Sequence, residues 1–366
     1  MYYKCLHCFF LLYFLFPLLT YGQTGKKTGA ESFTSQREFI KHKSFENKYL
    51  NKNNKELEKY SKWSNSSDSW DLYNLSYAID ANNTMYKATG NLKYLDRSIF
   101  YAKNAIKSSV NSKFLQNSQY QDDYCSWVNK SNPSKGNDGK EYALYESFCW
   151  RYVTDILKII YDYKLLNYQN YFHELLLFTE TNIYDKWESR GIANLYRSNV
   201  HMRSHWAKIA MILYVITKKN KYKVFLDTFI KDFTNHLIYT KTSKGVEVVK
   251  WYVAWEQKSK GFQDVSHGNA VVSTTIDIYE NNLGLNDRYI KALVNTMNHV
   301  IWSEEKGSLL IDGTGKGSSW FSDGFIKLGR YDDSLQTQFE NHKKGRSIQF
   351  LAHLTFNHVI ATQIAK

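Results

Sequence analysis

The sequence predicts an all-α, single-domain fold in which antiparallel helical hairpins close into an (α/α) toroid. The main observation is a repeated unit: an amphipathic helix ending in Tyr, a short polar turn, a second Tyr and another amphipathic helix. Short turns force the two helices of each unit to be antiparallel. Repeated units of this kind bury their cores against their neighbours. The copies carry the pairs Tyr86/Tyr94, Tyr161/Tyr171, Tyr214/Tyr222 and Tyr279/Tyr289, and a fainter copy starts at Phe325.

Two further observations support a closed ring. Beyond residue 22 the chain contains a single proline, Pro133, and proline breaks helices. The hairpins are separated by long polar segments of unequal length, which favour a toroid with loops on one rim over a regular solenoid.

The first 22 residues have the pattern of a secretory signal peptide. Lys4 precedes an apolar run, and Thr20-Tyr21-Gly22 offers small residues at a cleavage site after Gly22. The apolar run is too short for a membrane span. We therefore expect a secreted or periplasmic protein, with a signal peptide at 1–22, a polar N-terminal arm at 23–60 and the catalytic domain at 61–366.

The remaining elements follow from local pattern. The helix of residues 94–109 is amphipathic and is expected in an outer layer, whereas residues 210–216 are apolar nearly all round, as in an inner helix. Residues 111–140 are polar, with proline and glycine, and indicate a loop. The β-branched segment 246–255 predicts a short strand or an extended rim segment.

Charge indicates an anionic partner. The net charge is +13, and it would be +12 without the signal peptide. A positive field attracts and steers anions. The basic residues are spread along the chain without a basic tail or a known nucleic-acid motif, so we expect an acidic polysaccharide and no nucleic acid. Cys125 and Cys149 allow a disulfide without requiring one.

Two polar clusters, residues 184–206 and 251–269, lie near the starts of inner helices. Ser198 is a plausible N-cap that places His201 and His205 one turn apart on the same face. This His pair lacks the Glu of a zinc-binding HExxH motif, so no metal or cofactor is expected. Asp264 or Ser266 would cap the next inner helix.

From about Trp70 to the C-terminus, the hairpins together with SNVHMRSHW (198–206) and QDVSHGN (263–269) resemble the α/α-toroid polysaccharide lyases, which include alginate and glucuronan lyases. That family commonly has an Asn-His pair followed by Trp. Here Val200 separates Asn199 from His201, and Trp206 follows His205. The resemblance implies β-elimination, with a Tyr as base and acid and with polar groups that neutralise the uronate carboxylate.

Carried over residue by residue, the resemblance suggests that Asn199 and His201 neutralise the carboxylate, assisted by His267 or Arg330. Tyr252 is the first choice for the base and acid. The other candidates for catalysis are Tyr196 and Tyr331 as alternative tyrosines and Glu256 as a proton-sharing group. Expected substrate-binding residues are Arg190, Arg197, Arg203, His205, Trp187, Trp206, Trp255, Asn269 and Trp320.

Three other functions remain open at this stage. A glycoside hydrolase would use paired carboxylates, for which the candidates are Glu256 and Asp264 with Glu188 or Asp323. A uronate epimerase would share the proton abstraction. A non-catalytic glycan-binding protein would need the aromatic and basic residues without a catalytic base.

Overall fold

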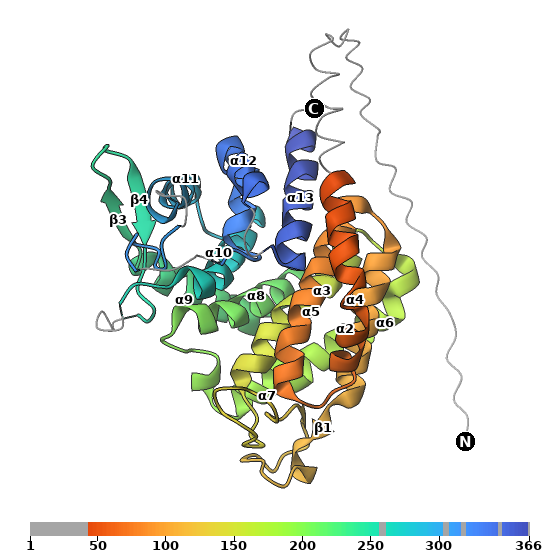
Figure 1. Cartoon of the computed structure of the whole chain (residues 1–366). Coiled ribbons are helices and arrows are strands. Elements are labelled where there is room, and N and C mark those ends of the chain that lie inside the picture. Colours follow the sequence, from red (N-terminus) through yellow and green to blue (C-terminus); the bar gives the residue numbers. More distant parts are fainter. Residues whose placement is uncertain (1–42, 256–260, 303–306, 316–319, 343–345, 365–366) are drawn as a thin grey trace, which may run out of the picture.

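Helices make up most of the chain that the computed structural model describes, namely residues 43–255, 261–302, 307–315, 320–342 and 346–364. They form two layers (Figure 1). The inner layer consists of α3 (Ser69–Thr89), α5 (Ala143–Asp162), α8 (Val200–Thr217), α10 (Val265–Glu280), the 3-10 helix η7 (Phe325–Arg330) and α13 (Ile348–Ile364). The outer layer consists of α2 (Leu57–Ser64), α4 (Leu92–Ser108), α6 (Gln169–Phe178), α9 (Asn220–Asn235), α11 (Asp287–Thr296) and α12 (Asp333–Asn341).

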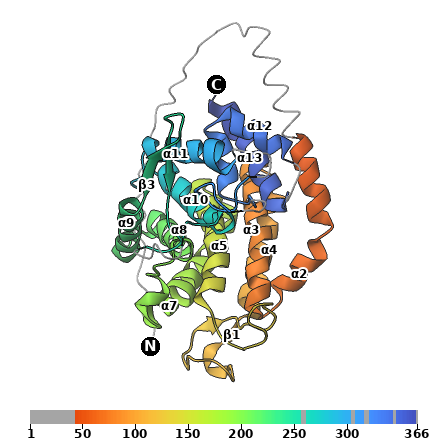
Figure 2. The same ribbon diagram turned by 60° about the vertical axis from the view of Figure 1, so that its left-hand side comes forward.

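The inner layer closes on itself. Going round it, α3 packs against α5, α5 against α8, α8 against α10, α10 against η7, η7 against α13, and α13 returns to α3. In Figure 2, α9 lies at one edge of the molecule and α2 at the other, with inner helices between them. The predicted all-α toroid of antiparallel hairpins is therefore confirmed.

Every predicted hairpin joins an inner segment to the outer helix that follows it. The pairs are α3/α4, α5/α6, α8/α9, α10/α11 and η7/α12. Local chemistry sets their ends. Gly90 ends α3 with φ 68°, a conformation that glycine adopts without strain, and Asn91 then caps α4 by accepting from Lys93 N–H. Asp264, Asn286 and Asp332 cap later helices in the same way.

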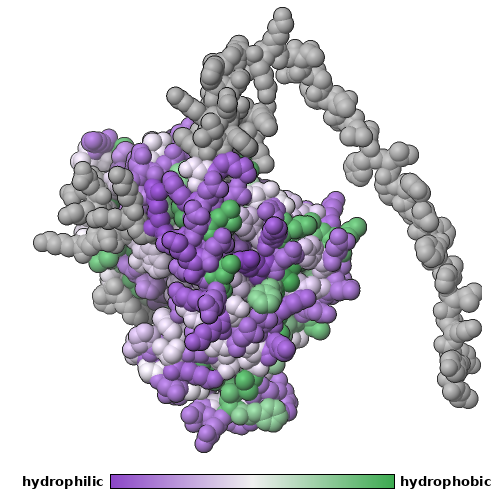
Figure 3. All heavy atoms as spheres, turned by 45° about the vertical axis from the view of Figure 1, so that its right-hand side comes forward, coloured by the Kyte–Doolittle hydropathy of each residue, from purple (hydrophilic) through white to green (hydrophobic). Residues whose placement is uncertain are grey.

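The expected outer helix 94–109 is α4, and the expected inner segment 210–216 lies in α8, where Ala210, Ile212 and Leu213 are fully buried. The core between the layers is rich in aromatic residues, and full burial of each large apolar side chain contributes about 1.5–3 kcal/mol. Figure 3 shows a mostly hydrophilic outer face with small separate hydrophobic patches. No helix in the described ranges has the length and apolarity needed to cross a membrane.

Short elements fill the connections. They are β1 (Val110–Asn111), η1 (Ser112–Phe114), β2 (Cys125–Ser126), η2 (Leu166–Tyr168), the π-helix η3 (Thr179–Asp185), α7 (Lys186–Ser189), η4 (Ile192–Asn194), β3 (Ile238–Lys241), β4 (Glu247–Lys250) and the π-helix η6 (Met297–Ile301). Strands β1 and β2 are antiparallel and lie in the segment predicted as a loop. Strand β4, which the sequence predicted, pairs with β3, antiparallel and in the register Ile238 to Lys250.

Three details differ from the sequence-based expectations. Residues 43–60 are helical rather than part of a polar arm, and Tyr49 is fully buried with its hydroxyl on Asn82. Asn199, rather than Ser198, caps α8, because its side chain accepts from Met202 N–H. The thiols of Cys125 and Cys149 are both free. The signal peptide expected at 1–22 lies outside the described residues.

Candidate functional site

A cavity of about 210 Å³ lies where four neighbouring inner helices begin. It collects side chains from the N-terminal halves of α3, α5, α8 and α10 and from residues 320–323. The helices therefore point their N-termini at the same space, and helix N-termini favour negative charge. Its walls comprise Tyr73, Tyr77, Leu144, Phe148, Arg151, His201, His205, Ser266, His267, Asn269, Ala270, Trp320, Ser322 and Asp323.

Arg151 supplies a buried positive charge to this cavity. Its side chain is inaccessible to solvent, and one nitrogen, Nη2, forms an ion pair with Asp323. Burial acts to lower the pKa of Arg151, but the Asp323 carboxylate outweighs it and holds this pKa above its usual value. Within the described part of the chain, Nε and Nη1 have no hydrogen-bond partner. Such unpaired buried donors are costly unless something accepts from them.

His201 and His205 lie one turn apart on α8, as predicted. His205 is 1% exposed, and neither ring nitrogen has a partner in the described ranges. Burial, together with Arg151, lowers the pKa of His205 well below its usual value. Burial and the neighbouring His267 lower the pKa of His201 to about 3. Both rings are therefore neutral near pH 7 and can donate or accept a hydrogen bond.

His267 lies next to His201 and has a carboxylate partner. Its Nδ1 lies 2.9 Å from Asp264 Oδ2, and its ring lies over that of His201 with 4.4 Å between centroids. The carboxylate can only accept, so Nδ1 carries the proton and Nε2 remains for another partner. The hydrogen bond to Asp264 raises the pKa of His267. Burial would raise the pKa of Asp264, but hydrogen bonds from His267 outweigh this and lower it to about 2.

Aromatic residues form the remaining wall. Tyr77 donates to the Tyr73 hydroxyl at 3.4 Å, and Tyr73 stacks on Phe148 with 4.1 Å between centroids. Burial raises the pKa values of both tyrosines, so their phenols stay protonated near neutrality. Trp320 is 40% exposed beside Tyr77 and lies at the mouth of the cavity. Aromatic faces beside hydroxyl groups suit sugar rings.

The side chain of Asn269 holds residues 320–325, which include Asp323, against the start of α10. Its amide donates to the Trp320 carbonyl at 2.8 Å and accepts from the Ser322 and Phe325 N–H groups. Gly324 passes so close that an added Cβ would lie 2.1 Å from the Asn269 carbonyl oxygen. The side chain of Asn269 is thus occupied within the protein, although the sequence suggested that it binds substrate.

Of the residues proposed from sequence, the cavity brings together His201, His205, His267, Asn269, Trp320 and Asp323, the last of which was a candidate for the hydrolase alternative. Half-buried Arg197 contributes its charge to the lowered pKa of His201. Three cavity residues were not proposed from the sequence, namely Arg151, Tyr73 and Tyr77. A lone Arg within the apolar stretch of residues 148–160 was a visible signal for the first.

Several proposed residues lie elsewhere. Tyr252 stacks on Phe262 with 4.6 Å between centroids and does not line the cavity. Its neighbours in the chain do pair with the start of α8, since Val200 N–H donates to the Val253 carbonyl. Asn199 is occupied as a helix cap. Glu256 lies outside the described residues.

Two arginines of the first polar cluster have structural partners, and three tryptophans of the two clusters are buried. Arg190 bonds Asp122 and Glu141 and anchors the 109–142 segment to α7. Arg203 pairs with Asp232 and lies over the rings of Tyr196 and Trp255. Three tryptophans expected to stack on sugars are instead buried: Trp187, Trp206 and Trp255.

Arg330 and Tyr331 lie at the opposite end of the ring. Both contact Glu280 at the C-terminus of α10, at 2.8 and 2.9 Å. A second cavity of about 260 Å³ at that end is lined by Arg330 and by ion pairs such as Lys327 with Asp277. Their position corrects two expectations: that Arg330 assists Asn199 and His201 in neutralising the carboxylate, and that Tyr331 is an alternative base and acid. Among the described residues, no three His, Cys, Asp or Glu side chains are grouped so as to hold a metal ion.

No protein-family model and no curated protein matches this chain. A similar solved structure is an inactive variant of an α-1,6-mannanase of Salegentibacter sp. HEL1_6 in complex with α-1,6-mannotetrose. The alignment covers 80% of this chain and 89% of that one, with 11% identity and a TM-score of 0.40. At that distance the likeness bears on neither substrate nor reaction.

Proposed function

We propose that this protein cleaves a uronate-containing, anionic polysaccharide by β-elimination in the cavity at the inner-helix N-termini. One observation carries the proposal. Buried Arg151, which has two nitrogens without a partner in the described ranges, and the neutral ring of His205 line the same small cavity as a histidine supported by a carboxylate. Such a cavity suits a sugar that bears one carboxylate and must lose a proton beside it.

The first role is to bind and neutralise the uronate carboxylate. Nε and Nη1 of Arg151 lie on different edges of the guanidinium, so either one can give the carboxylate a single charge-assisted hydrogen bond. His205 adds a neutral donor. Reducing the negative charge on this carboxylate makes the C5 proton more acidic, because the charge that builds on the carboxylate in the transition state is stabilised.

We assign the proton transfers to His267 and to the hydrogen-bonded pair of Tyr77 and Tyr73. His267 Nε2 takes the C5 proton, and Asp264 stabilises the imidazolium that forms. The electrons of the broken C5–H bond form the C4–C5 double bond, and the C4–O4 bond breaks. A phenol of the Tyr77–Tyr73 pair donates its proton to the departing oxygen. Solvent then returns the proton from His267 to the tyrosine.

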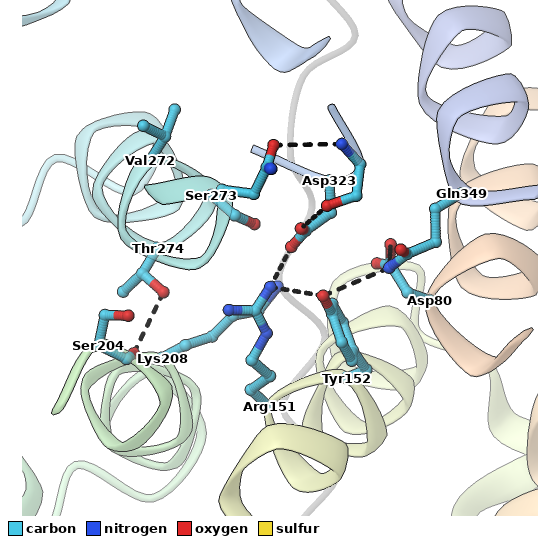
Figure 4. Close-up of polar contacts among 12 residues, drawn as sticks. Asp80, Arg151, Tyr152, Ser204, Lys208, Val272, Ser273, Thr274, Asp323 and Gln349 are labelled. Carbon is cyan, nitrogen blue, oxygen red and sulfur yellow. Dashed lines mark hydrogen bonds and ion pairs between the residues drawn. The ribbon is translucent and has the colours of Figure 1, made fainter. Parts of the chain in front are cut away.

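The alternative functions would each require different groups in the cavity. A glycoside hydrolase needs two carboxylates across the scissile bond. Asp323 lines the cavity but is paired with Arg151 (Figure 4), and Asp264, which is not among the lining residues, is hydrogen-bonded to His267. An epimerase would give a saturated polymer of altered configuration. A protein that only binds glycans would need neither His267 nor Tyr77 as a proton carrier.

The test measures the ultraviolet absorbance of unsaturated uronate products across several acidic polysaccharides, with alginate and glucuronan first. His267→Gln and Tyr77→Phe should each lower turnover by on the order of a hundredfold or more, with unchanged melting temperature. Tyr252→Phe should stay close to wild type, which separates the structural assignment from the sequence-based one. Saturated reducing-end products would instead establish a hydrolase.

We also propose that the reaction takes place outside the cytoplasm. The support is the signal peptide predicted at residues 1–22, together with the basic net charge of +13. N-terminal sequencing of the exported protein should find Gln23 first.

A further inference from the structure

Gln263, the residue directly before the cap of α10, is firmly held. It is fully buried, its backbone N–H donates to the Trp251 carbonyl at 3.1 Å, and its carbonyl accepts from Ile311 N–H at 3.0 Å. Its side chain packs against the first turn of α10, since a Cβ added to Gly268 would lie 3.7 Å from Gln263 Cγ. The side-chain amide therefore starts from a fixed position.

This amide bonds the carboxylate that supports His267. Gln263 Nε2 donates to Asp264 Oδ2 at 3.1 Å, and Oδ1 accepts from the backbone N–H of His267 at 2.9 Å as the cap of α10. A carboxylate held at Oδ1 alone could turn about its Cβ–Cγ bond, whereas a fixed donor on each oxygen sets its plane. In this plane both oxygens face His267 Nδ1, at 2.9 and 3.0 Å.

The other atom of the same amide has no partner. Within the described ranges, Gln263 Oε1 is closed to solvent and accepts no hydrogen bond. A buried acceptor in this state costs stability, which an apolar side chain of similar length would avoid. Only the NH2 group of an amide can face a carboxylate, so the bond to Asp264 also dictates which way the amide points.

We infer that Gln263 is a positioning residue, which holds the Asp264 carboxylate towards His267 so that the proton of the neutral imidazole stays on Nδ1 and Nε2 is free to act as the base. The role of Nε2 in this inference rests on the proposed function. A hydrogen bond from one ring nitrogen fixes the tautomer of a histidine. Catalytic bases are commonly oriented by a third group in this way.

Nitrogen NMR of labelled histidine, at a pH where the ring is neutral, measures the tautomer of His267, whose signal is assigned by its loss in His267→Gln. Gln263→Met keeps the approximate length of the side chain and removes both polar atoms of the amide. Gln336→Met is the matched control. Gln336 is also buried, and its Nε2 donates to a carboxylate, Glu340, at 3.3 Å, on α12 and away from the cavity.

We expect the ratio of the Nδ1–H form to the Nε2–H form to fall about fivefold in Gln263→Met, the effect of one typical hydrogen bond, and to keep its wild-type value in Gln336→Met. In an Asp264→Asn background, Gln263→Met should change the ratio by no more than about twofold, because the carboxylate through which it acts is gone. The melting temperature of Gln263→Met should not fall, since the unpaired acceptor is lost together with the donor.

An unchanged ratio in Gln263→Met overturns the positioning role. An equal change with and without the Asp264 carboxylate also overturns it, because a residue that only supports the fold would act in that way. Gln263→Leu, which likewise lacks the donor, should shift the ratio in the same direction and serves if Gln263→Met folds poorly.

Product formation then tests the proposed function separately, with kcat/KM of Gln263→Met expected to fall by the same factor of about five. A tautomer ratio that responds as expected, in a protein whose wild type forms no unsaturated product, would support the positioning role and contradict the proposed function.

Discussion

Two neighbouring histidines of the cavity, His201 and His267, have pKa values shifted in opposite directions. Burial lowers that of His201 to about 3, whereas Asp264 raises that of His267. The rings are chemically identical, so the difference comes from desolvation in one and a carboxylate partner in the other. Environments that separate the pKa values of neighbouring groups mark acid and base roles. At the residue scale, this contrast supports the proposal that His267 is the base.

The pH dependence of the rate follows from this assignment. A base must be unprotonated, so kcat/KM should rise with pH through the raised pKa of His267, above the ordinary value of about 6.5. Replacing Asp264 by Asn removes the charge that stabilises the imidazolium. The rising limb of the profile should therefore move to lower pH, and the plateau rate should fall.

The substitution to Asn is chosen because Asp264 also caps α10, and Asn is an equally good cap. Melting temperature should thus change little and serves as the control. A profile that keeps its rising limb in Asp264→Asn would remove Asp264 and His267 from the proton transfer.

At the scale of elements, the N-terminal halves of the inner helices carry the cavity residues, and the caps just before these helices fix where they begin. Asn199 illustrates the distinction. The sequence suggested a group that neutralises the carboxylate, but its side chain accepts from Met202 N–H and starts α8. Two residues later, His201 faces the cavity.

A pair of substitutions separates a cap from a catalytic amide. Asn199→Ala should lower the free energy of unfolding by about 1 kcal/mol, the usual cost of losing an N-cap, and keep turnover close to wild type. Asn199→Ser should preserve both stability and turnover, because serine caps a helix but carries no amide. Chemical denaturation and product absorbance measure the two effects. A stable Asn199→Ser protein without activity would restore the sequence-based role.

At the scale of the whole molecule, closure of the ring by α13 against α3 gathers the helix starts around one space. The whole sequence of 366 residues carries a net charge of +13. Most of these charges are far from the cavity, so they cannot select a carboxylate. They can raise the local concentration of a polyanion.

Salt should therefore act on capture of the polymer rather than on chemistry. The Debye length falls from about 30 Å at 0.01 M to about 8 Å at 0.15 M salt, which screens exposed charges far more than a buried one such as Arg151. KM for the polymer should rise over this range while kcat changes little. A uronate disaccharide, with few charges, is the control and should show a weaker rise. A KM for the polymer that does not change with salt concentration would contradict the role of the net positive charge in steering the polymer.

Much of the fold was predictable because it depends on sequence patterns within short segments. The tyrosine-tipped hairpins, the glycine and Asp or Asn residues at helix ends, and the strand at 247–250 depend on neighbours a few residues apart. The His201–His205 pair was found for the same reason, since a spacing of four places both on one helix face. Tyr49 was missed because its burial depends on α3, far along the chain.

The cavity itself was decided by tertiary structure. Tyr77, Arg151 and Asp323 lie on three segments separated by long stretches of chain, and only closure of the ring brings them together. Tyr252 had suitable chemistry and spacing, yet the chain turns it onto Phe262. Sequence patterns report which face of an element is apolar, because periodicity reflects that element alone. Which polar side chains share a space depends on how separate elements pack, and on this point the periodicity of each helix carries no information.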